Sequence, residues 1–146
     1  MINEQINVTG NLEVVLRDAS GNIKDTRSIP NLVVTVGKNF IASRMKDATA
    51  TAMSNMAVGT SSTSPAAGDT TLGTELARVA LTSTTVSTNT VAYVASYAAG
   101  TGTGALVEAG LFNAGTAGTM LAHTTYAVIN KGAADSLVIT WTITVG

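Results

Sequence analysis

The sequence predicts a mainly β protein: an antiparallel β-sandwich, jelly-roll-like, with an N-terminal β-hairpin and one short α-helix. Apolar and polar residues alternate along many short segments, as in strands with one buried face. Clusters of Gly, Asn, Asp and Ser separate these segments at regular intervals. The 146 residues are 45% hydrophobic but only 4% aromatic. The core must therefore consist mainly of Val, Leu, Ile and Ala.

The first 30 residues have the pattern of a hairpin. Strand alternation covers residues 6–8 and 12–16, a turn is expected at 18–22, and a second strand runs from 23 to 29. Gly10 and Asn11 predict a break within the first strand, and Pro30 ends the second. We expect residues 1–30 to form an N-terminal hairpin or arm and residues 31–146 to form the sandwich, within a single compact domain.

Residues 31–46 have a different spacing. Phe40, Ile41 and Met45 recur at helical intervals, with basic residues between them. This pattern predicts one amphipathic helix. We expect its three apolar residues to cover an open end or face of the sandwich rather than to dock into a partner.

The rest of the chain alternates between loops and strands. The middle segments are a polar loop at 47–54, a short strand at 53–58, an exposed loop at 59–71, and a turn or extended segment at 72–78. The later strands are expected at 79–87, 90–98, 105–112, 119–128 and 136–145. In the last strand the apolar residues of one face are Leu137, Ile139, Trp141, Ile143 and Val145.

Charge and composition exclude several classes of partner. The net charge is −1 and 12% of residues are charged, about half of the roughly 25% of an average domain. No basic patch indicates direct nucleic-acid binding, and no apolar run approaches the roughly 18 residues of a membrane span. The chain has no cysteine, and its start lacks the pattern of a secretory signal, so we expect synthesis in the cytosol.

Motifs for chemistry are weak. His123 is the one histidine, and we interpret it as a polar strand residue rather than a catalytic base. Asp69 offers a loop carboxylate to Ca²⁺, but the spaced carboxylates of an EF-hand loop are missing. The glycines of residues 100–104 predict a flexible hairpin loop, because no helix and no Lys-Ser/Thr pair follows them.

Two further kinds of site can be considered. Paired carboxylates for glycoside cleavage would have to come from distant residues such as Glu75 and Glu108. An aromatic sugar platform could use only Tyr93 and Tyr97, since Trp141 and Tyr126 have positions suited to the core. We predict no catalytic residue, no cofactor and no metal.

Two segments resemble small structural proteins of tailed-bacteriophage virions. The first is residues 56–78, MAVGTSSTSPAAGDTTLGTELAR, and the second is residues 108–113, EAGLFN. The first motif is fairly specific, whereas the second is short. Within the first, Pro65 stiffens the loop, and Glu75 and Arg78 are close enough for an ion pair.

The resemblance implies a non-enzymatic structural protein located in the virion and assembled in the host cytoplasm. Such proteins include capsid cement (decoration) proteins, which bridge and stabilise major capsid protein subunits, and tail-associated fibre, baseplate or adaptor components. The expected partners are the major capsid protein or other virion proteins, and further copies of the chain as a dimer or trimer. Outside these structural roles, the sequence leaves room for a small depolymerase or a non-viral binding module.

Candidate subunit contacts follow from exposure expected in the arm and in the long loop. An unpaired strand edge can add to a neighbour's sheet, and the tip of a loop can reach an adjacent subunit. The residues chosen on this basis are Ile2, Ile6, Val8, Ser61, Ser62, Thr63 and Ser64. The loop could instead serve its own subunit by closing the sandwich.

Overall fold

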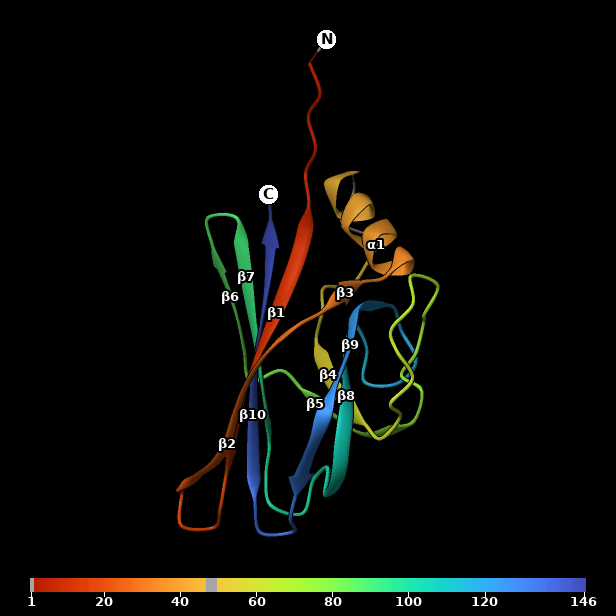
Figure 1. The fold of residues 1–146 in the computed structure, drawn as a ribbon. Coiled ribbons are helices and arrows are strands. Elements are labelled where there is room, and N and C mark those ends of the chain that lie inside the picture. The colour runs from red at the N-terminus through yellow and green to blue at the C-terminus, as the bar shows by residue number, and fades with distance from the viewer. Residues whose placement is uncertain (1, 47–49) are drawn as a thin grey trace.

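The computed structural model, which describes residues 2–46 and 50–146, is a sandwich of two antiparallel five-stranded sheets with one helix (Figure 1). The first sheet has the order β2-β1-β10-β7-β6, with strands β1 (Val8–Arg17), β2 (Ile23–Pro30), β6 (Ser83–Ser87), β7 (Thr90–Tyr97) and β10 (Ser136–Val145). The second has the order β3-β9-β8-β4-β5, with strands β3 (Leu32–Val33), β4 (Asn55–Gly59), β5 (Glu75–Ala80), β8 (Gly104–Phe112) and β9 (Met120–Lys131). The predicted mainly β sandwich is confirmed, while its jelly-roll connectivity stays a prediction.

The core lies between the facing sides of the two sheets. Alternate residues of β1 and β10 point inward, as the sequence pattern predicts, and they meet apolar residues of the second sheet. The inward side chains of these two strands that are almost fully buried are Leu12, Val14, Leu16, Leu137, Ile139, Trp141 and Ile143. Each such burial contributes about 1.5–3 kcal/mol relative to exposure. Val145, at the end of the same face, is 40% exposed because the core ends there.

β1 runs without interruption through Gly10, where the sequence predicts a break. Gly10 is paired with Ile143 of β10. A side chain at position 10 would collide with the amide group of Asn31. The Oδ1 atom of Asn31 accepts a hydrogen bond from Nε1 of Trp141 at 2.8 Å. The glycine therefore makes room for the group that satisfies the buried indole, and the predicted break is wrong.

The predicted strand at 79–87 is also wrong, because it divides into β5 and β6, which belong to different sheets. The crossing occurs at two adjacent residues. The amide of Leu81 donates to the carbonyl oxygen of Ser54 beside the second sheet, and the amide of Thr82 donates to Val94 in the first. Residues 82–85 after the crossing are all polar, and the sequence does not show which sheet they join.

Helix α1 (Thr35–Lys46) begins four residues later than the predicted start, since Leu32–Val33 pairs with β9 as β3. Phe40 and Ile41 pack against the core as expected. Met45 does not: it is 85% exposed. The last turn of α1 extends past the end of the second sheet, where no strand lies beneath it (Figure 1). The predicted loop at 47–54 falls partly outside the described residues, at 47–49.

The glycine-rich segment at 100–104 connects β7 of the first sheet to β8 of the second. It is therefore a loop, as predicted, but not the loop of a hairpin. Tyr93 and Tyr97 are buried in the core, and the Tyr97 hydroxyl donates to the carbonyl oxygen of Met56 at 2.6 Å. Neither tyrosine is placed to form a sugar-binding platform.

A buried lysine fastens the loops at the end of the sandwich opposite the N-terminus (Figure 1). Lys131 is 2% exposed, and its ammonium donates to the carbonyl oxygens of Ala98 and Asp135. Burial lowers the pKa of Lys131. The Asp135 carboxylate in turn pairs with Lys24 at 2.8 Å. The hydrogen bond from Lys24 lowers the pKa of Asp135.

Trp141→Ala is expected to lower the free energy of unfolding by about 3–5 kcal/mol, because it empties the site of the largest fully buried side chain. Trp141→Phe should cost about 1–3 kcal/mol, since it leaves the Asn31 amide without its donor. Urea unfolding of both variants measures these losses. Thr140→Ser, at a half-buried position on the opposite face of β10, is the control and should cost less than about 1 kcal/mol. Native stability of Trp141→Phe would contradict the role given to the Trp141–Asn31 hydrogen bond.

Candidate functional site

The side chain of Glu108, on β8, is a carboxylate with no exposed surface. Its Oε2 atom accepts hydrogen bonds from the backbone amides of Ser61 at 2.9 Å and Thr74 at 2.8 Å. Its Oε1 atom accepts one from the amide of Gly73 at 2.8 Å. These donors lie near the two ends of the loop 60–74, which connects β4 to β5. A single side chain therefore closes the loop against the second sheet.

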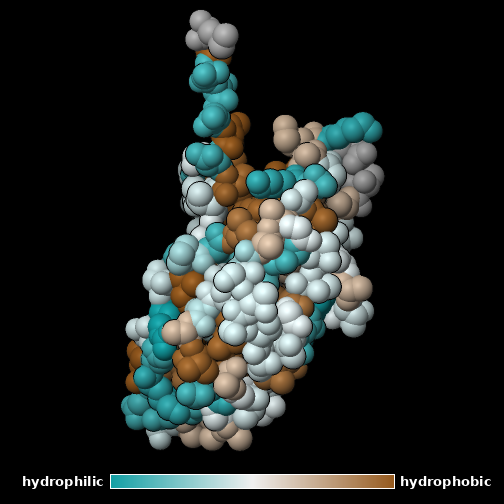
Figure 2. Space-filling model, turned by 45° about the vertical axis from the view of Figure 1, so that its right-hand side comes forward, coloured by the Kyte–Doolittle hydropathy of each residue, from teal (hydrophilic) through white to brown (hydrophobic). Residues whose placement is uncertain are grey.

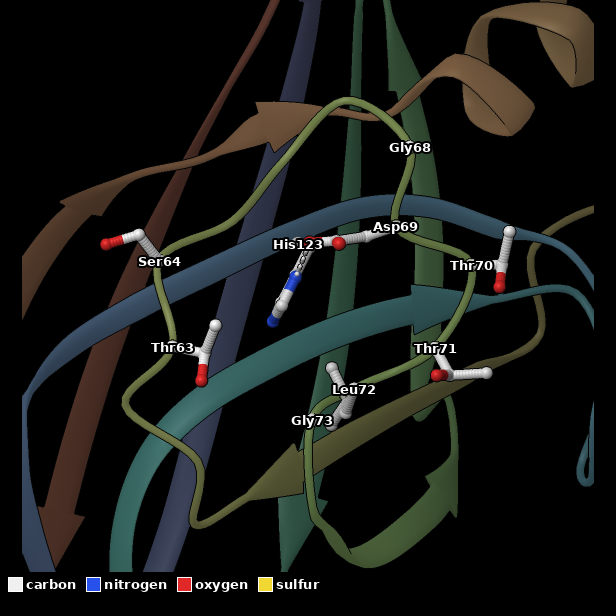
Figure 3. Close-up of a pocket in the computed structure, with 9 residues that line it drawn as sticks. All are labelled: Thr63, Ser64, Gly68, Asp69, Thr70, Thr71, Leu72, Gly73 and His123. Carbon is white, nitrogen blue, oxygen red and sulfur yellow. Dashed lines mark hydrogen bonds and ion pairs between the residues drawn. The ribbon is translucent and has the colours of Figure 1, made fainter.

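His123, on β9, continues this network toward the middle of the loop. Its Nε2 atom lies 3.2 Å from Oε1 of Glu108, and its Nδ1 atom lies 2.9 Å from Oδ2 of Asp69. Each ring nitrogen therefore has one carboxylate oxygen as its hydrogen-bond partner. In Figure 3, the His123 ring lies behind the loop with Asp69 pointing toward it. We call Glu108, His123 and Asp69 the loop clamp.

Asp69 fixes the far side of the loop. Its Oδ2 atom accepts a hydrogen bond from the amide of Ala66 at 2.8 Å, in addition to its contact with His123. The Ala66 N–H, followed by the His123 side chain, lowers the pKa of Asp69, although partial burial opposes this effect. The ionised carboxylate is therefore the form that holds the loop.

Gly59 allows the close approach on which the loop clamp depends. It ends β4 and is paired with Glu108 on one side and Glu75 on the other. A side chain at position 59 would collide with the carbonyl oxygen of Thr74 and with the Glu108 carboxylate. Only glycine leaves room for the carboxylate to lie between the strands and the loop.

A second clamp, formed by Glu75 and Arg78, lies beside the first. The ion pair that the sequence predicts between them is confirmed, with 2.7 Å between Nη2 of Arg78 and Oε1 of Glu75. The Arg78 guanidinium also lies over the Phe112 ring, 3.7 Å from its centroid. It donates to the carbonyl oxygens of Ala114 and Ala117. Arg78 thus fastens the β8–β9 connection to β5.

A polar hollow of about 370 Å³ opens between the loop and β9. Most of its lining residues are threonine, serine or glycine, and Figure 3 draws them around the His123 ring. Its lining residues are Thr63, Ser64, Gly68, Asp69, Thr70, Thr71, Leu72, Gly73 and His123. Asp69 and His123, the two titratable residues of this lining, contact each other at 2.9 Å.

The side chains considered for chemistry from the sequence are bonded to one another or to the backbone. Both ring nitrogens of His123 face carboxylates, and Glu108 already accepts three backbone amides. Glu75 is engaged by Arg78, so it does not form a pair with Glu108 for glycoside cleavage. Within residues 2–46 and 50–146, no group of three or more His, Asp or Glu side chains could surround a metal ion. Asp69 contacts His123 instead.

The predicted contact residues lie in two separate places. Ile2 and Ile6 are 94% and 67% exposed in the segment before β1, whereas Val8 is half-buried and packs against the core. Ser62, Thr63 and Ser64 are exposed on the loop, and Ser61 is half-buried because its amide meets Glu108. The structure does not bring the two groups together.

The loop clamp was not predicted from the sequence. Two signals were present: Glu108 stands in an otherwise apolar strand, and the single histidine follows the apolar residues 120–122 in the next strand. A charge in such a strand must find partners if it is buried. The partners are backbone amides of a loop more than 30 residues away, which side-chain motifs do not reveal.

Comparison with family models, with curated proteins and with solved structures gave no match for this chain. Among the described residues, none of the helices has the length and apolar character needed to cross a membrane.

Glu108→Gln is expected to destabilise the fold by about 2–4 kcal/mol. It removes the charge and turns an amide NH₂ toward at least one of three backbone donors. Urea unfolding and proteolysis of the loop 60–74 measure the effect. Glu75→Gln is the matched control, because it changes an exposed carboxylate on a strand of the same sheet and should cost less than about 1 kcal/mol. Equal losses in the two variants would contradict the proposed clamp.

Loop closure is expected to weaken at acid pH. The pKa of Asp69 is lowered in the folded chain, so its stabilisation is present above the unfolded value of about 3.9 and is lost as pH falls through the folded value. Hydrogen exchange of the loop amides between pH 7 and pH 3 follows the opening.

Asp69→Asn should weaken protection of the loop at neutral pH by about 1 kcal/mol and flatten its acid response. Asp18→Asn, in the β1–β2 turn, should leave both unchanged. A loop whose protection falls equally with pH in the Asp69→Asn variant and in the native chain would show that another group controls closure.

Proposed function

We propose that this chain is a non-enzymatic structural protein of a tailed-phage virion, acting as a capsid cement protein that bridges and stabilises major capsid protein subunits. One observation carries the proposal. The two segments that resemble virion proteins, residues 56–78 and 108–113, are joined in space by Glu108, which accepts the amides of Ser61, Gly73 and Thr74. The resemblance therefore rests on one structural unit rather than on two unrelated stretches.

The charged residues of both segments serve this unit. Asp69 and Glu108 belong to the loop clamp, and Glu75 and Arg78 form the second clamp over Phe112. Catalysis needs a group that can exchange a proton with a substrate or attack it. Side chains that hold backbone amides and one another are poorly placed for either task. Their arrangement supports a non-enzymatic role.

A fixed loop is useful to a protein that works by contact. The loop clamp holds the amides of Ser61 and Ala66 on either side of the exposed tip at Ser62–Ser64, so less ordering entropy is lost when the tip meets a neighbour. The low charge of the chain lets its Thr- and Ser-rich surface be buried at modest desolvation cost. An interface of standard size buries about 1,600 Å², and many copies on one shell add avidity.

Strand edges are further contact elements. β2 and β6 are the edges of the first sheet, and β3 and β5 are the edges of the second. All five residues of β6 are exposed, so its free edge is open to pairing. A neighbouring virion protein can extend the sheet by adding a strand there.

The copy number in purified virions tests the proposal. Quantitative mass spectrometry against the major capsid protein should give hundreds of copies, as expected for a protein placed at the symmetry positions of a shell. A number near three, six or twelve would instead assign the chain to a tail, fibre, baseplate or adaptor ring, where closed symmetry sets small numbers. Absence from virions would contradict both roles.

Binding to the shell tests the loop directly. Purified native chain added to shells that lack it should raise the temperature at which they disassemble, by mass action on the assembled state. Glu75→Gln should act like the native chain, and Glu108→Gln should stabilise the shell less, because its loop is no longer held. If the Glu108→Gln variant stabilises the shell as much as the native chain does, the loop 60–74 is not part of the contact with the shell.

A further inference from the structure

Residues 2–7, which we call the arm, leave the sandwich at the start of β1 and have no strand beside them among the described residues. Figure 1 shows the arm running beyond the C-terminus and past the end of α1. Its direction is fixed at the base, where the amide of Gly146 donates to the carbonyl oxygen of Asn7 at 2.7 Å. The arm contains neither glycine nor proline.

The arm continues the core-facing side of β1. Leu12, Val14 and Leu16 face the core, and Val8 packs against it. Side chains alternate along a strand, so Ile6 and Ile2 continue the same face. They are 67% and 94% exposed. The arm is thus an extended segment whose core-facing side carries Ile2 and Ile6 with Glu4 between them, and both isoleucines remain mostly exposed.

A groove that matches this face opens at the same end of the molecule. It has a volume of about 330 Å³, and ten of its twelve lining residues are apolar, Arg44 and Thr84 being the exceptions. Helix α1 forms one wall, and β6, β7 and β10 contribute to the other. The apolar residues that define it include Phe40, Ile41, Val86, Val91, Tyr93 and Ile143. Val86 is 71% exposed there.

The groove is continuous with the base of the arm. Ile41 lines the groove and also a neighbouring hollow that is bordered by Ile6, Val8 and Lys38. Figure 2 shows hydrophobic surface gathered in the notch where the arm leaves the body. Arm and groove therefore form one apolar region, but the arm points away from the groove of its own chain.

We propose that the arm of one copy binds in the groove of a second copy of this chain. Six residues in extended conformation span about 20 Å, which is enough to leave one body and lie along another. Ile2 and Ile6 enter the groove, and Glu4 between them faces the same side, where Arg44 lines the groove. The polar side chains of Asn3 and Gln5 stay in solvent. The occupant is a strand of this chain because each copy carries both halves of the contact.

Charge favours the same pairing. The arm has one charged residue, Glu4. Helix α1 carries Lys38, Arg44 and Lys46 and no acidic residue. The positive field of the helix therefore attracts an incoming arm, whichever of these side chains also bond within their own subunit.

This inference rests on the proposed structural role, because contacts between copies serve a protein that works as an assembly. Sedimentation equilibrium of the full chain over a range of concentrations tests it. The native chain should self-associate, and the double variant Ile2→Ser/Ile6→Ser should associate at least about tenfold more weakly. The matched control is Asn3→Ser/Gln5→Ser, which changes the opposite face of the arm and should associate like the native chain.

Disulfide trapping locates the contact. The chain has no cysteine, so a chain carrying Ile2→Cys can be mixed with one carrying Val86→Cys, and only a contact between copies forms the cross-link. The control is Val128→Cys on β9, which is 45% exposed and lies outside the groove. Cross-linking to position 86 and not to position 128 is expected.

A chain that stays monomeric at all concentrations, or that associates equally well as Ile2→Ser/Ile6→Ser, would overturn the inference. If the monomeric chain still needs the arm to bind shells, the arm's occupant is another virion protein, and the cement role stands. If the arm links copies of a chain that is absent from virions, the proposed function fails and the arm–groove contact stands.

Discussion

Burial of the Glu108 carboxylate is the constraint on which the arrangement of the second sheet and its long loop depends. Removing an ionised carboxylate from water costs several kcal/mol even after the protein relaxes, so its oxygens must be bonded. Three backbone amides and His123 meet this requirement. The dependence is mutual, because those amides come from a loop with no ladder of its own. Gly59 follows from the same constraint, since any side chain there would take the carboxylate's place.

The two clamps stabilise different parts of the second sheet. Glu108, His123 and Asp69 join β8, β9 and the loop 60–74, while Arg78 joins β5 to the β8–β9 connection and covers Phe112. Charge-assisted hydrogen bonds in such a network are worth about 1.5–3 kcal/mol each. They also specify geometry, because the donors and acceptors belong to different strands and loops that must keep their relative positions. A long loop of small polar residues, which would otherwise sample many conformations, thereby gains a defined shape.

The sequence predicts what depends on local pattern and misses what depends on contacts between distant segments. The alternation in residues 136–145 predicted β10 and the buried side of Trp141, because burial with period two is a local property. The crossing at Leu81 and Thr82 was missed because it is defined by hydrogen bonds to Ser54 and Val94 in different sheets, which a local pattern does not specify. For the site, the Glu75–Arg78 pair was predictable from its short spacing. The loop clamp was not, because it joins two strands to a loop through backbone amides.

The arm poses a question that the fold of a single copy does not answer. Scattered exposed apolar residues are ordinary on protein surfaces, but Ile2 and Ile6 are in phase with a core-facing strand and extend beyond its last pairing partner. Their burial adds nothing to the sandwich, because Val8 already meets the edge of the core. The groove between α1 and the ends of β6, β7 and β10 has apolar walls, but no segment of its own chain lies between them. Each feature supplies what the other lacks, and a second copy of the chain can satisfy both with the same few residues. A protein of low charge, with its loops held by internal clamps, can make such contacts repeatedly with little rearrangement.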